Sequence, residues 1–337
     1  MAKQTKLLLA VCVIFLVLFY SVDQVPERKV NASSDKSIRI YSVLPDDLTQ
    51  ALLNDYQLKT KSKLDYKLID KNQAFSANGE QPDLYLASRE NMIALALDNK
   101  LQKKPLFVQD HLPPSLYDVE GFWLGVCYDP YVFLVNNVYS RKVGQKNLQS
   151  WEDLANQNDI VVSMEDLSVS PEMRYFLAAF ASAQGEEAAF GVLKNIHKKI
   201  PQYAKFAISP IRLTTIGEAD LAITSRNKVI KYIENDFPAY IVEPLEGFPA
   251  QVFAAGIGRN SQKADVCEKI ISWLTKSNEA MIVTEKLGYG YLFLFPDETG
   301  FEGARPDKLW LNENYLSYDK QSALVDKWLQ NVRFTDK

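Results

Sequence analysis

Short apolar strand patterns alternate with helical patterns along this chain, and that alternation limits its fold more than any other feature. Residues 38–42, 64–69 and 83–88 have the β-branched and aromatic composition of strands. The first of these strands is followed by a helix start at Pro45 and two aspartates. The third is followed by apolar residues at helical spacing over residues 90–97. Because strands joined by helices in this order build parallel sheets, we predict an α/β fold.

A polar stretch at residues 140–149 divides this pattern into two halves. Before it, apolar runs at 122–127 and 131–135 predict two strands around Asp129 and Pro130. After it, helices open at Ser150 and Ser170, and strands follow at 160–163, 217–223 and 239–243. A strand at 252–257 and a helix at 264–276 then rebuild the first half. Since roughly 300 residues exceed one usual core, we predict one lobe from residues 38–137 with 248–337, and a second from 138–247.

The N-terminus has the pattern of an export signal. Lys3 and Lys6 precede an unbroken apolar run at residues 7–20, and the chain then turns polar. As a helix this run spans about 21 Å, against about 30 Å for a bilayer core. We therefore predict a signal or membrane-anchor segment at 1–22, a tether at 23–37, and an extracytoplasmic location. The sequence leaves open whether the segment is cleaved.

Composition excludes several classes of function. The chain has a formal net charge of −4 and no long basic run, which argues against nucleic-acid binding. Two isolated histidines, His111 and His197, and the lack of a C-x-x-C motif exclude a zinc site of the usual kind. Cys127 and Cys267 could form a disulfide in an exported protein, but their apolar surroundings favour two separate buried thiols. No nucleophile elbow, P-loop or dinucleotide motif occurs, so we expect neither an enzyme such as an exported hydrolase nor a cofactor.

Several short motifs occur in a familiar order, namely those at residues 40–42, 83–88, 151–154, 217–223 and 244–247, and then the helical tail at 264–288. In this order they resemble the bacterial extracellular (periplasmic) solute-binding proteins of type II, in the branch of ABC importers for ferric iron, phosphonates and sugar phosphates. The resemblance implies a two-lobed periplasmic-binding-protein-like fold that closes by hinge motion at crossings near 136–140 and 244–250. It also implies a small-molecule ligand between the lobes and an ABC permease as partner. The alternative is a ligand sensor of the same fold, coupled to a membrane two-component kinase.

One departure from this family concerns the ligand. Its iron-binding members carry adjacent tyrosines soon after the strand that follows the Gly-Glu motif, whereas this chain has Thr224-Ser225-Arg226-Asn227 there. Hydroxyls beside a fixed guanidinium suit an anionic ligand, since arginine offers a bidentate fork to carboxylate or phosphate. We therefore predict a phosphate- or carboxylate-bearing solute and no metal.

The predicted ligand contacts are residues at strand ends, helix starts and crossings, where open α/β sheets bind ligands. They are Ser42, Ser88, Tyr128, Ser168, Ser170, Ser209, Ser225, Arg226 and Glu246. A structural role competes with binding at each position: a serine there can cap a helix or close a turn, a tyrosine can pack in the core, and a lone charge can face water.

Overall fold

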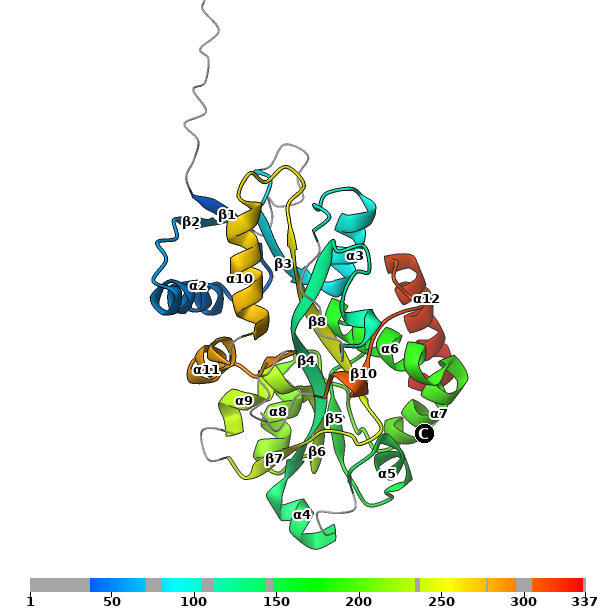
Figure 1. Cartoon of the computed structure of the whole chain (residues 1–337). Coiled ribbons are helices and arrows are strands. Elements are labelled where there is room, and N and C mark those ends of the chain that lie inside the picture. Colours follow the sequence, from blue (N-terminus) through cyan, green and yellow to red (C-terminus); the bar gives the residue numbers. More distant parts are fainter. Residues whose placement is uncertain are drawn as a thin grey trace, which may run out of the picture. The chain divides into compact units, whose positions relative to one another are not determined.

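One sheet of ten strands runs through the described part of the chain (Figure 1). The computed structural model describes residues 37–70, 80–104, 112–143, 148–233, 237–276, 278–294 and 305–335. The strand order is β2-β1-β3-β8-β4-β6-β5, with β7 and β9 paired to β4 and β10 paired to β8. The strands are β1 (Ile38–Ser42), β2 (Tyr66–Leu68), β3 (Leu84–Ser88), β4 (Trp123–Asn136), β5 (Val162–Met164), β6 (Leu221–Ser225), β7 (Ala239–Val242), β8 (Phe248–Ile257), β9 (Leu292–Phe293) and β10 (Leu309–Trp310). This confirms the α/β class.

Helices cover this sheet. They are α2 (Asp46–Thr60), α3 (Arg89–Leu97), α4 (Asn137–Val143), α5 (Trp151–Asn156), α6 (Pro171–Gln184), α7 (Glu186–His197), α8 (Ile208–Thr215), α9 (Arg226–Ile233), α10 (Ala264–Lys276), α11 (Glu279–Lys286) and α12 (Tyr318–Trp328). Short 3-10 turns occupy Pro114–Leu116 and Pro306–Lys308, and a π-helical turn at Leu329–Arg333 follows α12. Within the described residues no helix has the length and apolarity needed to cross a bilayer. The predicted segments 1–22 and 23–37 lie outside the described residues, apart from Ser37.

Helix starts follow the local signals in the sequence. The Ser170 hydroxyl accepts a hydrogen bond from the Met173 N–H at 3.2 Å, and Pro171 takes the first helical position of α6, where its missing N–H costs nothing. Ser150 caps α5 in the same way through the Asp153 N–H, at 2.9 Å. These caps satisfy backbone donors that the first helical turn leaves without partners.

Strand β4 corrects the prediction of two strands at 122–127 and 131–135. It is one strand of 14 residues, and every residue in it is buried. Its first part pairs antiparallel with β8 as far as Pro130, and its second part pairs with β6 and β7 from Tyr131 on. β4 exchanges its partners between Pro130 and Tyr131, a few residues before the predicted first crossing near 136–140.

The buried apolar residues form separate clusters on the two parts of β4. One pair of clusters covers the two faces of β1, β3, β8 and the first part of β4, which we call the first lobe. The other pair covers the faces of β6, β7 and the second part of β4, which we call the second lobe. Because β3 is covered on both faces, its sequence is apolar up to Ser88 instead of alternating.

The C-terminal helix packs on the second lobe. Leu324, Val325 and Trp328 of α12 are buried in the same cluster as residues of α6 and α7, and Figure 1 shows α12 beside those helices. The predicted first lobe, 38–137 with 248–337, includes this segment, because nothing in the segment's local pattern points to a distant partner. The exact bounds of the lobes, 38–137 with 248–337 and 138–247, stay a prediction.

Two further crossings lie next to each other. The chain returns from β7 to β8 through Glu243 to Gly247, which overlaps the predicted range 244–250, and passes again to the second lobe through Arg305 to β10. The guanidinium of Arg305 pairs with Glu243 at 3.1 Å and lies 5.2 Å from the centroid of the Phe248 ring. Its backbone N–H donates to the Tyr128 hydroxyl at 2.8 Å. Arg305 therefore contacts residues at all three crossings: the one within β4, the one between β7 and β8, and its own before β10.

Candidate functional site

Charged side chains gather where β4 exchanges its partners. Asp129 lies one residue before Pro130, is only 9% exposed, and accepts a hydrogen bond from the Asn227 N–H at 2.9 Å. Ser225 ends β6 opposite Tyr131, and Arg226 begins α9. The strand register and the start of α9 thus bring Asp129 and Arg226 together, although they are almost a hundred residues apart in the sequence.

The N-terminus of α6 lies in the same region. Lys228 on α9 has its Nζ 4.0 Å from Glu165 Oε2, and Glu165 follows β5 directly and lies beside the Ser170 hydroxyl. The Tyr131 hydroxyl donates to the Glu172 carbonyl oxygen in the first turn of α6, at 3.1 Å. We call the set Asp129, Glu165, Ser170, Ser225, Arg226 and Lys228 the junction cluster.

Two carboxyls in the junction cluster are harder to ionise than usual. Burial raises the pKa of Asp129 to about 6, although the Asn227 N–H, the nearby Ser225 hydroxyl and the Lys228 and Arg226 charges all lower it. Burial also raises the pKa of Glu165, and the Lys228 charge opposes this. The loss of hydration therefore outweighs the attraction of the neighbouring cations, and each carboxyl binds its proton more tightly than the same carboxyl would in water.

The first lobe contacts the junction cluster through the segment after α11. Arg226 Nη1 donates to the Gly290 carbonyl oxygen at 2.9 Å, and the Gly290 N–H donates to the Asn227 side-chain oxygen at 2.9 Å. A Cβ at Gly290 would lie 2.8 Å from the Arg226 carbonyl oxygen, so only glycine allows this approach. Arg226 is half-buried and pairs with no carboxylate among the described residues, which leaves most of its five N–H donors available.

Two predicted serines lie at strand ends of the first lobe but use their hydroxyls internally. The Ser42 hydroxyl is 2.8 Å from the Thr49 hydroxyl, and both residues are buried. The Ser88 hydroxyl caps α3 by accepting from the Asn91 N–H at 3.3 Å. β1 and β3 are parallel neighbours, so the two serines share one edge of the sheet. Their role as ligand contacts stays a prediction.

The other predicted residues lie in different settings. Tyr128 is fully buried and bonded to the Arg305 backbone, and Ser168 donates from its hydroxyl to Asp166 at 2.6 Å. Ser209 lies in the first turn of α8. Glu246 accepts from the Trp151 N–H at 2.6 Å and so caps α5. The structure brings together Ser170, Ser225 and Arg226 of the predicted set.

Sequence reasoning missed three members of the junction cluster: Asp129, Glu165 and Lys228. Asp129 carried a usable signal, because an aspartate inside a long apolar run must find partners when the strand is buried. Glu165 and Lys228 carried none, since each belongs to a polar stretch that is typical of exposed turns and helix surfaces.

The described residues hold no group of three or more histidine, cysteine, aspartate or glutamate side chains that could bind a metal ion. His197 is buried and lies 3.1 Å from the Tyr203 hydroxyl, and His111 is outside the described residues. Cys127 and Cys267 are both buried free thiols. The structure thus confirms the prediction of two separate thiols.

Comparisons with solved structures agree with this architecture. Each neighbour named here has a sequence identity below 25% and therefore bears on the fold alone. A periplasmic binding protein, AfuA of Actinobacillus pleuropneumoniae, solved with fructose-6-phosphate, is 21% identical, with coverage of 89% and 99% of the two chains and a TM-score of 0.62. A Bordetella ferric binding protein is 18% identical, with coverage of 87% and 98% and a TM-score of 0.68. A Trichodesmium protein solved with iron and citrate is 17% identical, with coverage of 89% and 100% and a TM-score of 0.66.

The sequence comparisons identify the family. An uncharacterized protein of Haemophilus influenzae is 26% identical over 208 residues, which is 60% of this chain and 60% of that protein. Residues 38–290, which include all members of the junction cluster, match the model of the bacterial extracellular solute-binding proteins. The solved neighbours are two-lobed periplasmic binding proteins, and the mixed α/β fold of this chain matches theirs. The chain therefore belongs to the bacterial extracellular solute-binding proteins.

Proposed function

We propose that this protein is the extracytoplasmic receptor of an ABC importer, and that it binds a small phosphate- or carboxylate-bearing solute between its lobes. The observation that carries the proposal is the position of Arg226. It begins α9 at the end of β6, near the Ser170-capped start of α6, and most of its donors have no partner in the part of the chain that the structure describes. Helix starts and a guanidinium together favour a bound oxyanion.

The raised carboxyl pKa values fit the same proposal. An anion that approached Arg226 would be repelled by ionised Asp129 and Glu165, and burial shifts both carboxyls toward their neutral form. A protonated carboxyl also becomes a hydrogen-bond donor, which an oxyanion can accept. We therefore expect anion binding to raise these two pKa values further and to take up protons.

The solved neighbours supply a second line of support. AfuA was solved with a sugar phosphate, and the Trichodesmium protein with iron and citrate. Both sets of ligands carry phosphate or carboxylate oxygens. In this chain the segment that follows β6 offers Arg226, Asn227 and Lys228 in place of tyrosines, so a free anionic solute is favoured over a bare ferric ion.

A ligand screen followed by calorimetry tests the proposal. The full chain in non-ionic detergent is screened by thermal shift against phosphonates, sugar phosphates, phosphoglycerates, citrate, polyamines and neutral sugars. A ligand at about one hundredfold its Kd stabilises the folded state by about 2.7 kcal/mol, so a true ligand gives a clear shift. We expect anionic compounds to shift the transition, and a shift by neutral sugars alone would overturn the anionic assignment.

Variants then locate the site. Arg226→Gln is expected to weaken the binding of an anionic hit by roughly tenfold or more, since a charge-assisted hydrogen bond is lost. Arg141→Gln removes the same charge from the exposed surface of α4 and serves as the matched control. Equal affinities of the two variants would remove Arg226 from the site. Loss of solute uptake in cells that lack the protein would assign transport, whereas an intact uptake with a lost transcriptional response would assign sensing.

A further inference from the structure

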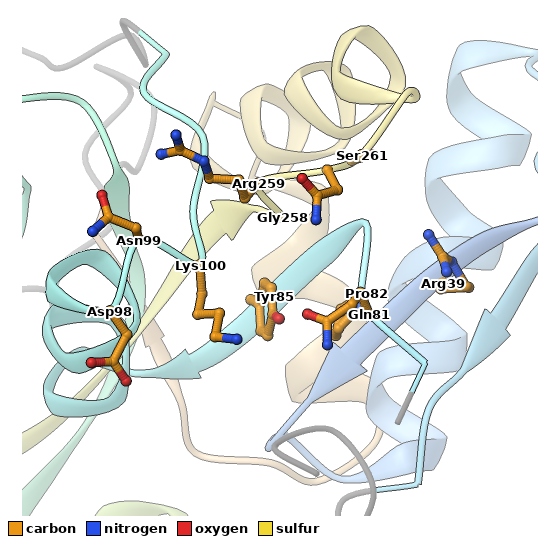
Figure 2. Close-up of a pocket in the computed structure, with 11 residues that line it drawn as sticks. Arg39, Gln81, Pro82, Tyr85, Asp98, Asn99, Lys100, Gly258, Arg259 and Ser261 are labelled. Atoms are coloured by element: carbon orange, nitrogen blue, oxygen red, sulfur yellow. The ribbon is translucent and has the colours of Figure 1, made fainter. Parts of the chain in front are cut away.

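A cavity of about 400 Å³ opens in the first lobe, and it contains no member of the junction cluster. It lies where β1 and β3 begin and β8 ends, and the turns after α3 and β8 complete it (Figure 2). Its volume is in the range of small-molecule sites. The lining is polar, with amides from Gln81, Asn99 and Asn260.

Positive charge dominates this lining. Arg39, Lys100 and Arg259 contribute three cations, and among the described residues Asp98 alone contributes a carboxylate to the lining. Arg39 is paired with the buried Asp83 at 3.1 Å. Lys100 and Arg259 are exposed and form no ion pair within the described ranges.

Tyr85 places a neutral donor at the cavity wall. The residue is only 2% exposed, yet it lines the cavity and its hydroxyl makes no hydrogen bond to any residue that the structure describes. Burial raises the pKa of Tyr85 to about 12, so the hydroxyl keeps its proton at neutral pH. Figure 2 shows the Lys100 amine and the Gln81 amide on either side of the Tyr85 ring.

The backbone around the cavity is fixed in advance of any ligand. The Arg259 N–H donates to the Lys100 carbonyl oxygen at 2.8 Å, and the Gly258 N–H donates to the Asp83 carbonyl oxygen at 2.9 Å. A side chain at Gly258 would collide with the Pro82 carbonyl, so glycine is needed for this close packing. A site whose backbone is held in this way loses little entropy on binding.

We propose that this cavity is a second binding site, specific for a phosphate group. A lysine amine, a phenol and an amide that approach from separate directions match a tetrahedral oxyanion with several acceptor oxygens, whereas a carboxylate is better matched by a single planar arginine fork. The phosphate has two possible sources, a soluble phosphate ester or a phospholipid headgroup.

Protection of Lys100 from acylation tests the proposal at the residue itself. The full chain in non-ionic detergent is treated with a lysine-acylating reagent, and modification is read by mass spectrometry. Inorganic phosphate and glycerol phosphate form one arm, with chloride at the same ionic strength as control. Vesicles of phosphatidylglycerol form the other arm, with phosphatidylcholine vesicles as control. Lys194, exposed on α7 of the second lobe, is the internal reference.

We expect at least one arm to slow the acylation of Lys100 by about tenfold when phosphate exceeds its Kd about tenfold, while Lys194 is unaffected. Arg259→Gln and Tyr85→Phe should each reduce this protection, and Arg226→Gln should leave it unchanged, which separates this site from the one between the lobes. Protection by vesicles alone assigns the headgroup. If Lys100 and Lys194 respond alike in both arms, or if protection survives both cavity variants, the proposal is wrong.

Discussion

Replacement of Asp129 by asparagine tests the balance of forces at the strand crossing. The carboxyl is buried in β4, accepts the Asn227 N–H at 2.9 Å, and lies beside Ser225. Asparagine has the same shape, can still accept from Asn227 through its side-chain oxygen, and can donate to the Ser225 hydroxyl. The substitution therefore removes the ionisable proton and keeps the contacts.

The expected magnitude follows from the pKa of Asp129, which burial raises to about 6. The difference from an ordinary aspartate corresponds to about 3 kcal/mol, since one pKa unit is worth about 1.4 kcal/mol. Because the folded state binds the proton more tightly than the unfolded state, the free energy of unfolding falls as pH rises from about 4 to about 6. Below that window the carboxyl is neutral in both states and has no effect.

Asp129→Asn should therefore be more stable than the parent protein at pH 7, by up to about 3 kcal/mol, and equally stable near pH 4. Urea unfolding, followed by the fluorescence of the five tryptophans at several pH values, measures this difference. Burial also raises the pKa of Glu90 to about 6, which makes the free energy of unfolding depend on pH in the same window. Because the parent and the variant both carry Glu90, this contribution cancels in the difference between them. A variant that is less stable than the parent at every pH would show that Lys228 and Arg226 stabilise the ionised carboxylate, and would refute the argument from burial.

Three further variants or measurements address the crossings and the thiols. Arg305→Ala removes the contacts with Glu243 and should lower the free energy of unfolding by about 1–3 kcal/mol, measured by urea unfolding; an unchanged midpoint would contradict the role of Arg305 in tying the crossings together. Gly290→Ala places a Cβ against the Arg226 carbonyl and should weaken ligand binding by calorimetry while the thermal transition is retained; unchanged affinity would show that the lobes do not close at this contact. Cys127 and Cys267 should not react with a thiol reagent until the protein is unfolded, because burial raises both thiol pKa values, that of Cys267 to about 12; rapid labelling of the native protein would contradict their burial.

Local signals in the sequence were sufficient to place many helices. The proline and serine before α6 specify its start because they act on neighbouring backbone groups, and α10 matches the predicted range 264–276 through its apolar spacing. The α/β class follows from the same local information, since strand and helix patterns alternate. Features that depend on distant residues were not accessible in this way.

Strand β4 shows why. Asp129 and Pro130 interrupt the apolar run, and a charge followed by a residue without an N–H is normally the sign of a turn. The strand continues because Pro130 lies where β8 gives way to β6 and β7 as partners, and because Asp129 finds the Asn227 N–H. Both reasons lie on other strands and helices. The same limit applies to α12, whose apolar face could have packed on either lobe.

The predicted site shows a related limit, because a serine at a strand end or helix start is an equally good local partner. Ser42, Ser88 and Ser168 each use their hydroxyl within a few residues of their own position. Arg226 differs, since the one side-chain hydrogen bond that it makes among the described residues, to Gly290, leaves most of its donors unused. The number of donors that the fold leaves unsatisfied therefore separates Arg226 from the serines more sharply than position in the sheet does, and it makes Arg226 the first residue to substitute once an anionic ligand is found.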